Sequence, residues 1–155
     1  MNQQPDLGAI ARAIIDSNMY MVLGTADETG QPWVSPVYYA SAGYMQFYWV
    51  SSPEVRHSCN IVARPHISIV VFDSRVPIGT GQAVYMSAVA EELTGVELDR
   101  GIDIYSHSSL AHGGHEWKPE DVRAPAIYRL YRATALKHWI LDPTGHPDHR
   151  TPVTV

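Results

Sequence analysis

Short apolar runs separated by glycine-containing turns dominate the chain from Met19 onward, and they restrict the fold more than any other feature. Three runs come first: MYMVLGTA from Met19, PWVSPVYYA from Pro32 and YMQFYWVS from Tyr44, with DETGQ and SAG between them. Aromatic and β-branched residues favour strands, and short glycine-containing turns join antiparallel neighbours. This part of the sequence therefore predicts a series of β-hairpins.

The second half of the chain continues the same pattern with three longer runs. These are HISIVVFDS from His66, QAVYMSAVAEEL from Gln82 and APAIYRLYRATALKHWIL from Ala124. Together the runs give about six strands in mostly antiparallel order, with helices only between them. Such an arrangement predicts a mainly β protein of the α+β class, built on a small closed or partly closed barrel.

Helices are predicted at three places. DLGAIARAIIDSN places Leu7, Ile10, Ala11, Ile14 and Ile15 at helical spacing behind Asp6, which can cap the first turn. SPEVRHSCNIVARP fits a short helix that has Pro53 at its first position, where a missing N–H is tolerated. A third helix is expected around GVELDRGIDIYSHS, before a loop rich in histidine and glycine.

Length and composition predict one domain, over residues 1–155. A chain of 155 residues has the size of one domain and can bury a large core. We expect an N-terminal lid helix over 1–18, the barrel over 19–142 and a tail over 143–155. The net charge of −5 argues against a nucleic-acid partner, because such partners are bound through basic faces. The single cysteine, the absence of a signal-peptide pattern and the lack of long apolar stretches predict a cytoplasmic protein without a membrane partner.

The stretch SSPEVRH suggests a holder for an anion. The first N–H groups of a helix lack partners and carry partial positive charge, which favours phosphate. Ser51 and Ser52 add hydroxyl donors, and Arg56 adds a planar fork that suits phosphate oxygens. On spacing alone an alternative stays open, in which Ser52 is only the N-cap and Arg56 is a solvated helix residue.

The order of three segments resembles the pyridoxamine phosphate oxidase-like, flavin-binding split-barrel family. The segments are GTADETGQPWVSPVYY, WVSSPEVRHSCNIVARPHISIVVF and GQAVYMSAVAEEL, and the similarity runs from about Met19 to Leu141. The resemblance implies a split antiparallel β-barrel of about six strands with peripheral helices. It also implies a homodimer with FMN at the interface between the subunits, and a small-molecule substrate.

The resemblance further implies which residues bind the cofactor. Arg56 matches the first basic position of the phosphate site, and His57 stands where the family usually has lysine. The other implied positions lie on three strand segments and near the C-terminus. The full predicted set is Val34, Ser35, Pro36, Val37, Val50, Ser51, Ser52, Arg56, His57, Gln82, Trp139 and Arg150.

One departure from the family pattern bears on the substrate. Pyridoxamine phosphate oxidases carry an Arg-Leu-His-x-Arg element for the substrate phosphate, but the matching stretch here, GHPDHR, has only His149 and Arg150. Oxidation of vitamin B6 is therefore not expected. The wider family includes FMN-dependent reductases, deazaflavin enzymes and haem-degrading relatives. A deazaflavin tail would need a basic groove, and basic residues other than Arg56 and Arg64 are sparse in the first two-thirds, which favours FMN.

We therefore expect an FMN-dependent oxidoreductase that transfers hydride between the flavin and a small organic substrate. A flavin enzyme can work without an acid–base side chain, and the sequence predicts no catalytic dyad. Two alternatives stay open: a reductase that uses the deazaflavin coenzyme, and a flavin-binding module for storage or sensing.

The segment SHSSLAHGGHEW allows a rival interpretation as a metal site. Imidazole and carboxylate groups bind zinc, so His107, His112, His115 and Glu116 are candidate ligands. Their spacing fits no recognised zinc pattern, and no metal site is predicted. The other interpretations are a substrate-facing lid and a surface loop.

Cys59 is expected to pack inside its helix. The aromatic residues Tyr38, Tyr39, Tyr44, Tyr48 and Trp49 are expected to fill the barrel and the dimer contact.

Overall fold

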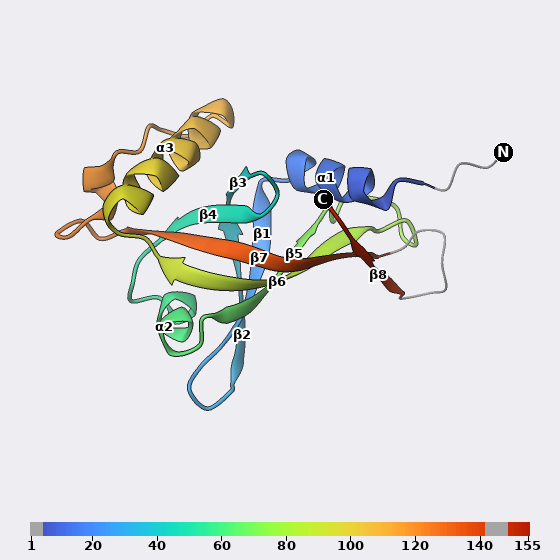
Figure 1. Ribbon diagram of the computed structural model, residues 1–155, viewed down its shortest axis with the longest axis horizontal. Coiled ribbons are helices and arrows are strands. Elements are labelled where there is room, and N and C mark those ends of the chain that lie inside the picture. Colours follow the sequence, from blue (N-terminus) through green and yellow to red (C-terminus); the bar gives the residue numbers. More distant parts are fainter. Residues whose placement is uncertain (1–4, 142–148) are drawn as a thin grey trace.

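The computed structural model describes residues 5–141 and 149–155, and its centre is one antiparallel sheet (Figure 1). The strand order is β2-β1-β5-β6-β7-β4-β3, and β8 pairs with β7. The strands are β1 Tyr20–Ala26, β2 Pro32–Tyr38, β3 Ala40–Ala42, β4 Gln46–Ser51, β5 His66–Phe72, β6 Ala83–Glu92, β7 Arg129–Leu141 and β8 Arg150–Val153. The sheet curves into a half-barrel, which confirms the expected α+β split-barrel fold.

Three α-helices surround the sheet: α1 Leu7–Ser17, α2 Arg56–Ala63 and α3 Gly95–Ala111. A short 3-10 helix spans Pro119–Val122. Figure 1 shows α3 and α1 towards opposite ends of the molecule and α2 close to the β2 hairpin. No helix in the described ranges is long and apolar enough to cross a membrane.

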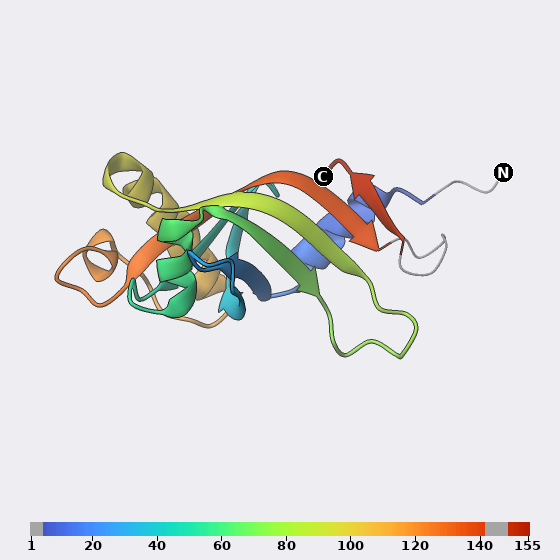
Figure 2. The ribbon, with the colours of Figure 1, turned by 90° about the horizontal axis from the view of Figure 1, so that it is seen from below.

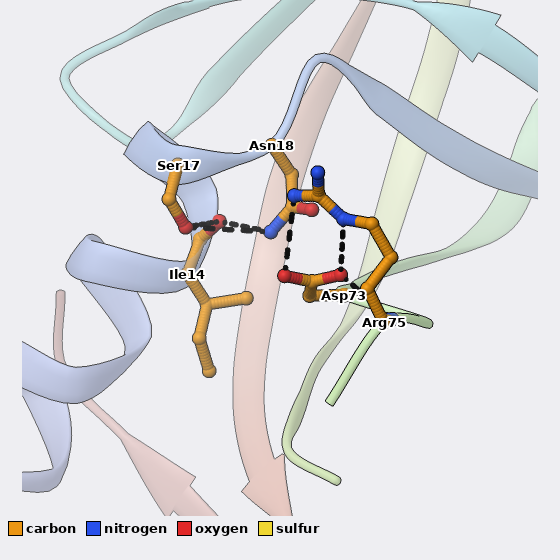
Figure 3. Close-up of polar contacts among 5 residues, drawn as sticks. All are labelled: Ile14, Ser17, Asn18, Asp73 and Arg75. Carbon is orange, nitrogen blue, oxygen red and sulfur yellow. Dashed lines mark hydrogen bonds and ion pairs between the residues drawn. The ribbon is translucent and has the colours of Figure 1, made fainter. Parts of the chain in front are cut away.

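Helix α1 forms as the apolar spacing predicts. Asp6 accepts a hydrogen bond from the Ala9 N–H at 3.0 Å, and Ala11 and Ile15 are buried against the sheet. The helix ends where the Asn18 side chain donates to the Ile14 carbonyl at 2.8 Å (Figure 3). Because this amide satisfies a carbonyl without an intrahelical partner, the chain turns directly into β1.

The inner face of the half-barrel holds the main core. Alternate residues of every long strand point inward, and α1 closes the core from one side. Trp49 and Tyr131 stack in its centre, with ring centroids 5.6 Å apart and planes 17° apart. Of the five aromatic residues expected to fill the barrel, Tyr39 and Trp49 are buried in this core and Tyr44 packs against it. Tyr48 and Tyr38 belong instead to the second core, under α3.

Helix α3 covers part of the outer face and forms a second core with β3, β4 and β7. Leu98 and Ile102 are buried there beside Tyr48 and Leu130. A Cβ at Gly101 would lie 2.9 Å from the Tyr48 ring, so only glycine lets the helix approach this closely. The remaining outer face, over β1, β2, β5, β6 and the second half of β7, is left uncovered by α3.

The predicted start of α2 was wrong. Pro53 is not at the first helical position and Ser52 is not the N-cap, because the helix begins at Arg56 with Val55 as N-cap. The Ser52 hydroxyl accepts instead from the Glu54 N–H at 3.2 Å, which stabilises a turn before the helix.

The prediction that Cys59 is packed was also wrong, since this residue is exposed on the outer side of α2.

Three strand boundaries differ from the sequence prediction. The last long strand begins at Arg129, because residues 124–128 form a loop after the 3-10 helix. The segment SAG was expected to form only a turn. Its first two residues instead belong to strand β3, Ala40–Ala42, which pairs with β4. β8 lies in the segment expected to be a tail, where Trp139 pairs with Pro152 and Leu141 with Arg150.

Candidate functional site

Two straight rows of residues cross the uncovered outer face. Strand register places Val34, Gly24, Ser68, Ser87 and Lys137 in one row from β2 to β7. The next row consists of Pro36, Val22, Val70, Tyr85 and Trp139. The first row has small residues at its centre and larger side chains at both ends. The sheet therefore forms a hollow bordered by Val34, Tyr85 and Trp139.

This first hollow has a volume of about 370 Å³ and lies over Gly24, Ser68 and Ser87. A Cβ at Gly24 would lie 2.4 Å from the Ser68 hydroxyl oxygen. The bare backbone at Gly24 is therefore part of what keeps the floor open. A flat ring can lie on such a floor, because only glycine and the short serine side chains occupy its centre.

A second hollow of about 390 Å³ continues from the first. Both are lined by Val70 and Tyr85, and the second also reaches Gln82. We call the two hollows together the outer groove. Gln82 stands at the end of the loop before β6, which Figure 2 shows extending beyond the sheet. The groove therefore brings together three predicted cofactor residues from distant parts of the chain: Val34, Gln82 and Trp139.

The one acidic side chain that lines the outer groove, among the described residues, is paired. Asp73 accepts from Arg75 Nε at 3.1 Å, from Arg75 Nη2 at 3.4 Å and from the Arg75 backbone N–H at 2.9 Å (Figure 3). The hydrogen bonds from Arg75 lower the pKa of Asp73. This carboxylate is therefore charged but balanced, and it does not give the groove a net negative charge.

Two cations border the groove near β7 and β8. The guanidinium of Arg150 lies 4.7 Å from the centre of the Tyr85 ring. The Lys137 ammonium lies 5.9 Å from the centre of the Trp139 ring. Both rings line the first hollow, so a basic margin exists locally on an acidic protein. Arg150 was predicted from sequence, and the structure places its guanidinium over Tyr85, which pairs with the predicted Trp139.

Arg56 lies beside β2, on the side of the strand opposite to the outer groove, because Trp33 shares the inward side of β2 with Ser35 and Val37. It is exposed on the first turn of α2, and its guanidinium lies 4.2 Å from the centre of the Trp33 ring on β2. Trp33 directly precedes Val34, which lines the first hollow. In the described part of the chain Arg56 has no carboxylate partner within 4.0 Å. Its charge is therefore available to a ligand.

His57 points inward and contributes no permanent charge. Its Nε2 lies 2.8 Å from the Ser51 hydroxyl, and the residue is buried. Burial lowers the pKa of the His57 imidazole, because the charged form loses hydration. Of the predicted basic pair, only Arg56 is therefore a fixed cation on the surface.

The free edge of β2 presents one amide beside the groove. Tyr39 donates to the Met19 carbonyl and Asp27 donates to the Gln31 carbonyl, so the odd-numbered residues of β2 bond to β1. The even-numbered residues face the open edge, and Pro32 and Pro36 have no N–H to present there. Val34 alone offers its backbone N–H between these two prolines.

Several predicted residues are not brought to the groove. Val37 is buried in the main core, and Ser35 lies on the same inward side of β2. Val50 packs with the α3 core instead. Ser51 and Ser52 lie at the end of β4 and in the following turn, near α2 and away from both hollows.

Other arginines that could hold a phosphate are engaged elsewhere. Arg64 donates to the carbonyls of Asp27 and Glu28, where it supports the β1–β2 turn. Arg132 is paired with Glu91 at 2.7 Å and Glu97 at 2.6 Å, and Arg129 Nε lies 3.7 Å from Glu92. Most of the segment GHPDHR lies outside the described residues, apart from His149 and Arg150.

The histidines of the 107–115 segment are separated by their contacts. His112 Nδ1 lies 2.8 Å from the Tyr38 hydroxyl, whereas the His115 ring lies against Trp117 with centroids 4.4 Å apart. Within residues 5–141 and 149–155 no group of three potential ligands gathers in a metal-binding arrangement.

Sequence reasoning had missed Gly24, Ser68, Tyr85 and Lys137. Their position at the outer groove depends on strand register.

Comparison with known proteins identifies a family. Residues 8–125 match the sequence model of the family described as Pyridoxamine 5'-phosphate oxidase. A search of curated proteins found no match.

Solved structures repeat the fold at low sequence identity. A heme binding protein from Mycobacterium smegmatis superposes with a TM-score of 0.76 at 19% identity, over 98% of this chain and 59% of that protein. The heme storage protein from Vibrio cholerae has a TM-score of 0.67 at 16% identity, over 84% and 91% of the two chains. An F420 reductase has a TM-score of 0.60 at 16% identity, over 82% and 94%. The chain spans less than two-thirds of the mycobacterial protein, and these likenesses establish the fold.

Proposed function

This chain belongs to the pyridoxamine 5'-phosphate oxidase family, and from that premise we propose that it is an FMN-dependent oxidoreductase. In this proposal hydride passes between the flavin and a small organic substrate. The main support for the proposal is the lining of the outer groove. Val34, Gln82 and Trp139, which the family resemblance had indicated as cofactor residues, line its two adjoining hollows.

The groove suits a flat, fused ring system. Gly24, Ser68 and Ser87 leave the floor of the first hollow low, and Trp139 and Tyr85 supply aromatic walls. The Val34 N–H faces the open edge of β2, where it can donate to a ring nitrogen or oxygen. The Gln82 side chain is available for a second polar contact in the second hollow. These features support binding of an isoalloxazine ring.

The phosphate of FMN is assigned to Arg56. Its guanidinium is exposed and has no described acidic partner, and stacking on Trp33 holds it beside β2, the edge strand that carries Val34. A planar guanidinium forms two parallel hydrogen bonds with phosphate oxygens. Ser52 adds a hydroxyl in the adjacent turn, although that turn precedes the helix and Ser52 does not cap it.

A bound flavin would supply the hydride chemistry, because its ring both accepts and donates hydride. The chain would orient the ring and place charge at its margins. Arg150 and Lys137 border the groove at β7 and β8, where positive charge stabilises a reduced, anionic ring. This assignment includes no acid–base pair in the groove.

We also propose that the protein is a cytoplasmic homodimer whose two copies cover the outer groove. Apolar side chains that line the groove are unusually exposed: Val34 is 67% exposed and Phe72 45%. Exposed apolar residues gathered on one face indicate an interaction surface. A two-fold pairing would cover both cofactor sites equally.

Two other ligands compete with FMN in this proposal. One is the deazaflavin coenzyme, since an F420 reductase shares the fold. Arg64 is already bonded to backbone carbonyls, so the groove near α2 has little free positive charge for a polyglutamate tail. The other is heme, which two of the similar structures bind or store according to their descriptions. A flavin-storage module without turnover is the third alternative.

An absorption titration tests the proposal. Purified protein is titrated separately with FMN, with the deazaflavin coenzyme and with hemin, and the visible spectrum is recorded after each addition. We expect a structured flavin band that shifts until one FMN is bound per chain, followed by bleaching when a reduced nicotinamide cofactor is added. A sharp Soret band with hemin and no shift with FMN would overturn the proposal. FMN binding without bleaching by any nicotinamide cofactor would favour the storage module.

A further inference from the structure

A separate pocket of about 280 Å³ lies where the C-terminal end of α3 meets β1 and β2. Its lining includes Tyr20, Tyr38, Ser109 and His112. Tyr20 pairs with Tyr38 across the two strands, on the same outer face as Val22 and Pro36 of the outer groove. The pocket therefore adjoins the groove but shares no lining residue with it.

The hydroxyl of Tyr38 is held in place by two partners on α3. Ser108 Oγ and His112 Nδ1 each lie 2.8 Å from the Tyr38 oxygen. A phenol donates one hydrogen bond and accepts two. When His112 carries its hydrogen on Nδ1 and Ser108 also donates, the Tyr38 hydrogen is left for a third partner. In that arrangement the network presents the Tyr38 hydroxyl as a donor at the pocket wall.

The far wall is a turn that is fixed to the end of α3. The Gly114 N–H donates to the Ser109 carbonyl at 2.8 Å, and the Ser109 hydroxyl donates to the His115 carbonyl at 2.9 Å. A Cβ at Gly114 would lie 2.3 Å from Ser109 Oγ, so glycine is needed for this close approach. The turn is thus held by specific contacts, which keeps the pocket formed.

The rest of the lining is apolar and aromatic. The rings of Tyr20 and Tyr38 meet edge to face, with centroids 6.2 Å apart and planes 78° apart. Tyr20 and Met19 are 60% and 46% exposed, so much apolar surface faces solvent here. A thioether and two aromatic rings favour contact with another ring. Among the described residues no carboxylate or ammonium group lines the pocket, which disfavours an ionic ligand.

We infer that this pocket binds a single aromatic ring that carries a neutral oxygen acceptor, such as an aromatic carboxamide, with the Tyr38 hydroxyl as hydrogen-bond donor to that oxygen. The ring would pack against Tyr20 and Met19. Because the pocket adjoins the outer groove, its ligand is assigned as the substrate of the oxidoreductase, and in this respect the inference rests on the proposed function. Binding itself requires no flavin.

The test is a titration of the flavin-free protein with benzamide, followed by NMR of protein that carries ¹³C-labelled histidine. The His112 signal is assigned from its loss in His112→Asn. We expect benzamide to shift this signal with a dissociation constant on the order of millimolar, as is usual for a one-ring ligand. Tyr38→Phe keeps the ring but removes the donor, and it should weaken binding about three- to tenfold.

Two controls make the result specific. Tyr128→Phe alters a tyrosine outside the pocket and should leave benzamide binding unchanged. Toluene, which lacks the oxygen, should bind more weakly than benzamide to the parent protein. Equal affinities of the parent and Tyr38→Phe for benzamide, equal affinities for benzamide and toluene, or no shift at all would each overturn the inference.

Parallel FMN titrations separate this inference from the proposed function. FMN binding without a benzamide shift would overturn the pocket assignment alone. If benzamide shifts the signal in a Tyr38-dependent way but FMN does not bind, the ring-binding pocket is supported and the proposed FMN-dependent function is contradicted.

Discussion

The guanidinium of Arg56 on α2 lies 4.2 Å from the centre of the Trp33 ring on β2, although the two residues belong to elements that share no strand pairing. A cation over an indole face is attracted by the ring quadrupole and keeps its charge. The contact therefore holds Arg56 beside β2, the edge strand whose next residue, Val34, lines the outer groove. It is the structural basis for assigning the FMN phosphate to this residue.

Replacing Arg56 should separate phosphate binding from ring binding. Hydrogen bonds to charged groups contribute roughly 1.5–3 kcal/mol, so Arg56→Ala should weaken FMN binding about ten- to a hundredfold. Riboflavin has the same ring without the phosphate and should lose little affinity. Titration by flavin fluorescence quenching measures both. Arg100→Ala, which removes an exposed arginine on α3, is the matched control. Equal losses for FMN and riboflavin, or no loss for either, would refute the assignment.

The sequence predicted the fold better than it predicted the site. Hairpin turns and apolar alternation are local signals, so most strands and α1 could be identified from neighbouring residues. The start of α2 was mispredicted because Ser52-Pro53 resembles a helix start, whereas the Ser52 hydroxyl forms a separate turn. β8 carries little local signal of its own, and its position depends on pairing with β7.

The site depends on relationships that the sequence does not display. Gly24, Ser68 and Ser87 form a floor only because the register of three strands aligns them. Tyr38 and His112 are far apart in the chain, and only the packing of α3 on the outer face brings them together. The family resemblance indicated Val34, Gln82 and Trp139 as cofactor residues, but it could not predict which residues of β2 point inward.

Filling the floor of the first hollow should affect the ring of the cofactor and not its phosphate. Gly24→Val favours the extended backbone of a strand, but its Cβ must displace the Ser68 hydroxyl, which would otherwise lie 2.4 Å away. Its side chain would occupy the space over Ser68, so FMN and riboflavin should both lose at least about tenfold in affinity. Ala63→Val, on the exposed end of α2, should change neither. Fluorescence titration and a circular dichroism melt together distinguish lost binding from lost structure.

If Gly24→Val folds and binds both flavins like the parent, the ring does not lie on this floor. The contrast with Arg56→Ala is informative, since one variant should affect both ligands and the other should affect mainly FMN.

The buried histidines predict a loss of stability in mild acid. Burial lowers the pKa of His57 and of His138 from the usual value, so the unfolded chain binds more protons near pH 6 than the folded protein. The free energy of unfolding should therefore fall as the pH drops below about 6.5, by up to about 1.4 kcal/mol per pH unit for each histidine.

Urea unfolding at about pH 7.5 and about pH 5.5 measures this dependence. The double variant His57→Gln and His138→Gln should show a smaller difference between the two pH values than the parent. His107→Gln, at an exposed position on α3, serves as control and should keep the parental difference. A parental pH dependence in the double variant would show that other groups cause it.

The uncovered outer face predicts the oligomeric state. Static light scattering should report twice the chain mass of 17.2 kDa. Val34→Lys places a charge in the proposed interface and should produce monomers with weakened FMN binding. Val62→Lys changes an even more exposed valine, at 84% exposure on α2, and should leave the dimer intact. A parent protein that is monomeric while it binds FMN tightly would contradict the shared cofactor site.

Efficient oxidation of pyridoxamine phosphate is not expected, because the arginines that could hold the substrate phosphate are engaged. Arg132 bonds to Glu91 and Glu97, and Arg129 bonds to the carbonyls of Ala126 and Tyr128. Releasing either would break charged hydrogen bonds that contribute about 1.5–3 kcal/mol each. Turnover by FMN-loaded protein, followed as pyridoxal phosphate formation, should therefore be far below the turnover of a dedicated oxidase. Turnover at the level of a dedicated oxidase would contradict this expectation. If that turnover were abolished in Arg150→Ala but kept in Arg132→Lys, Arg150 alone would suffice for the substrate phosphate.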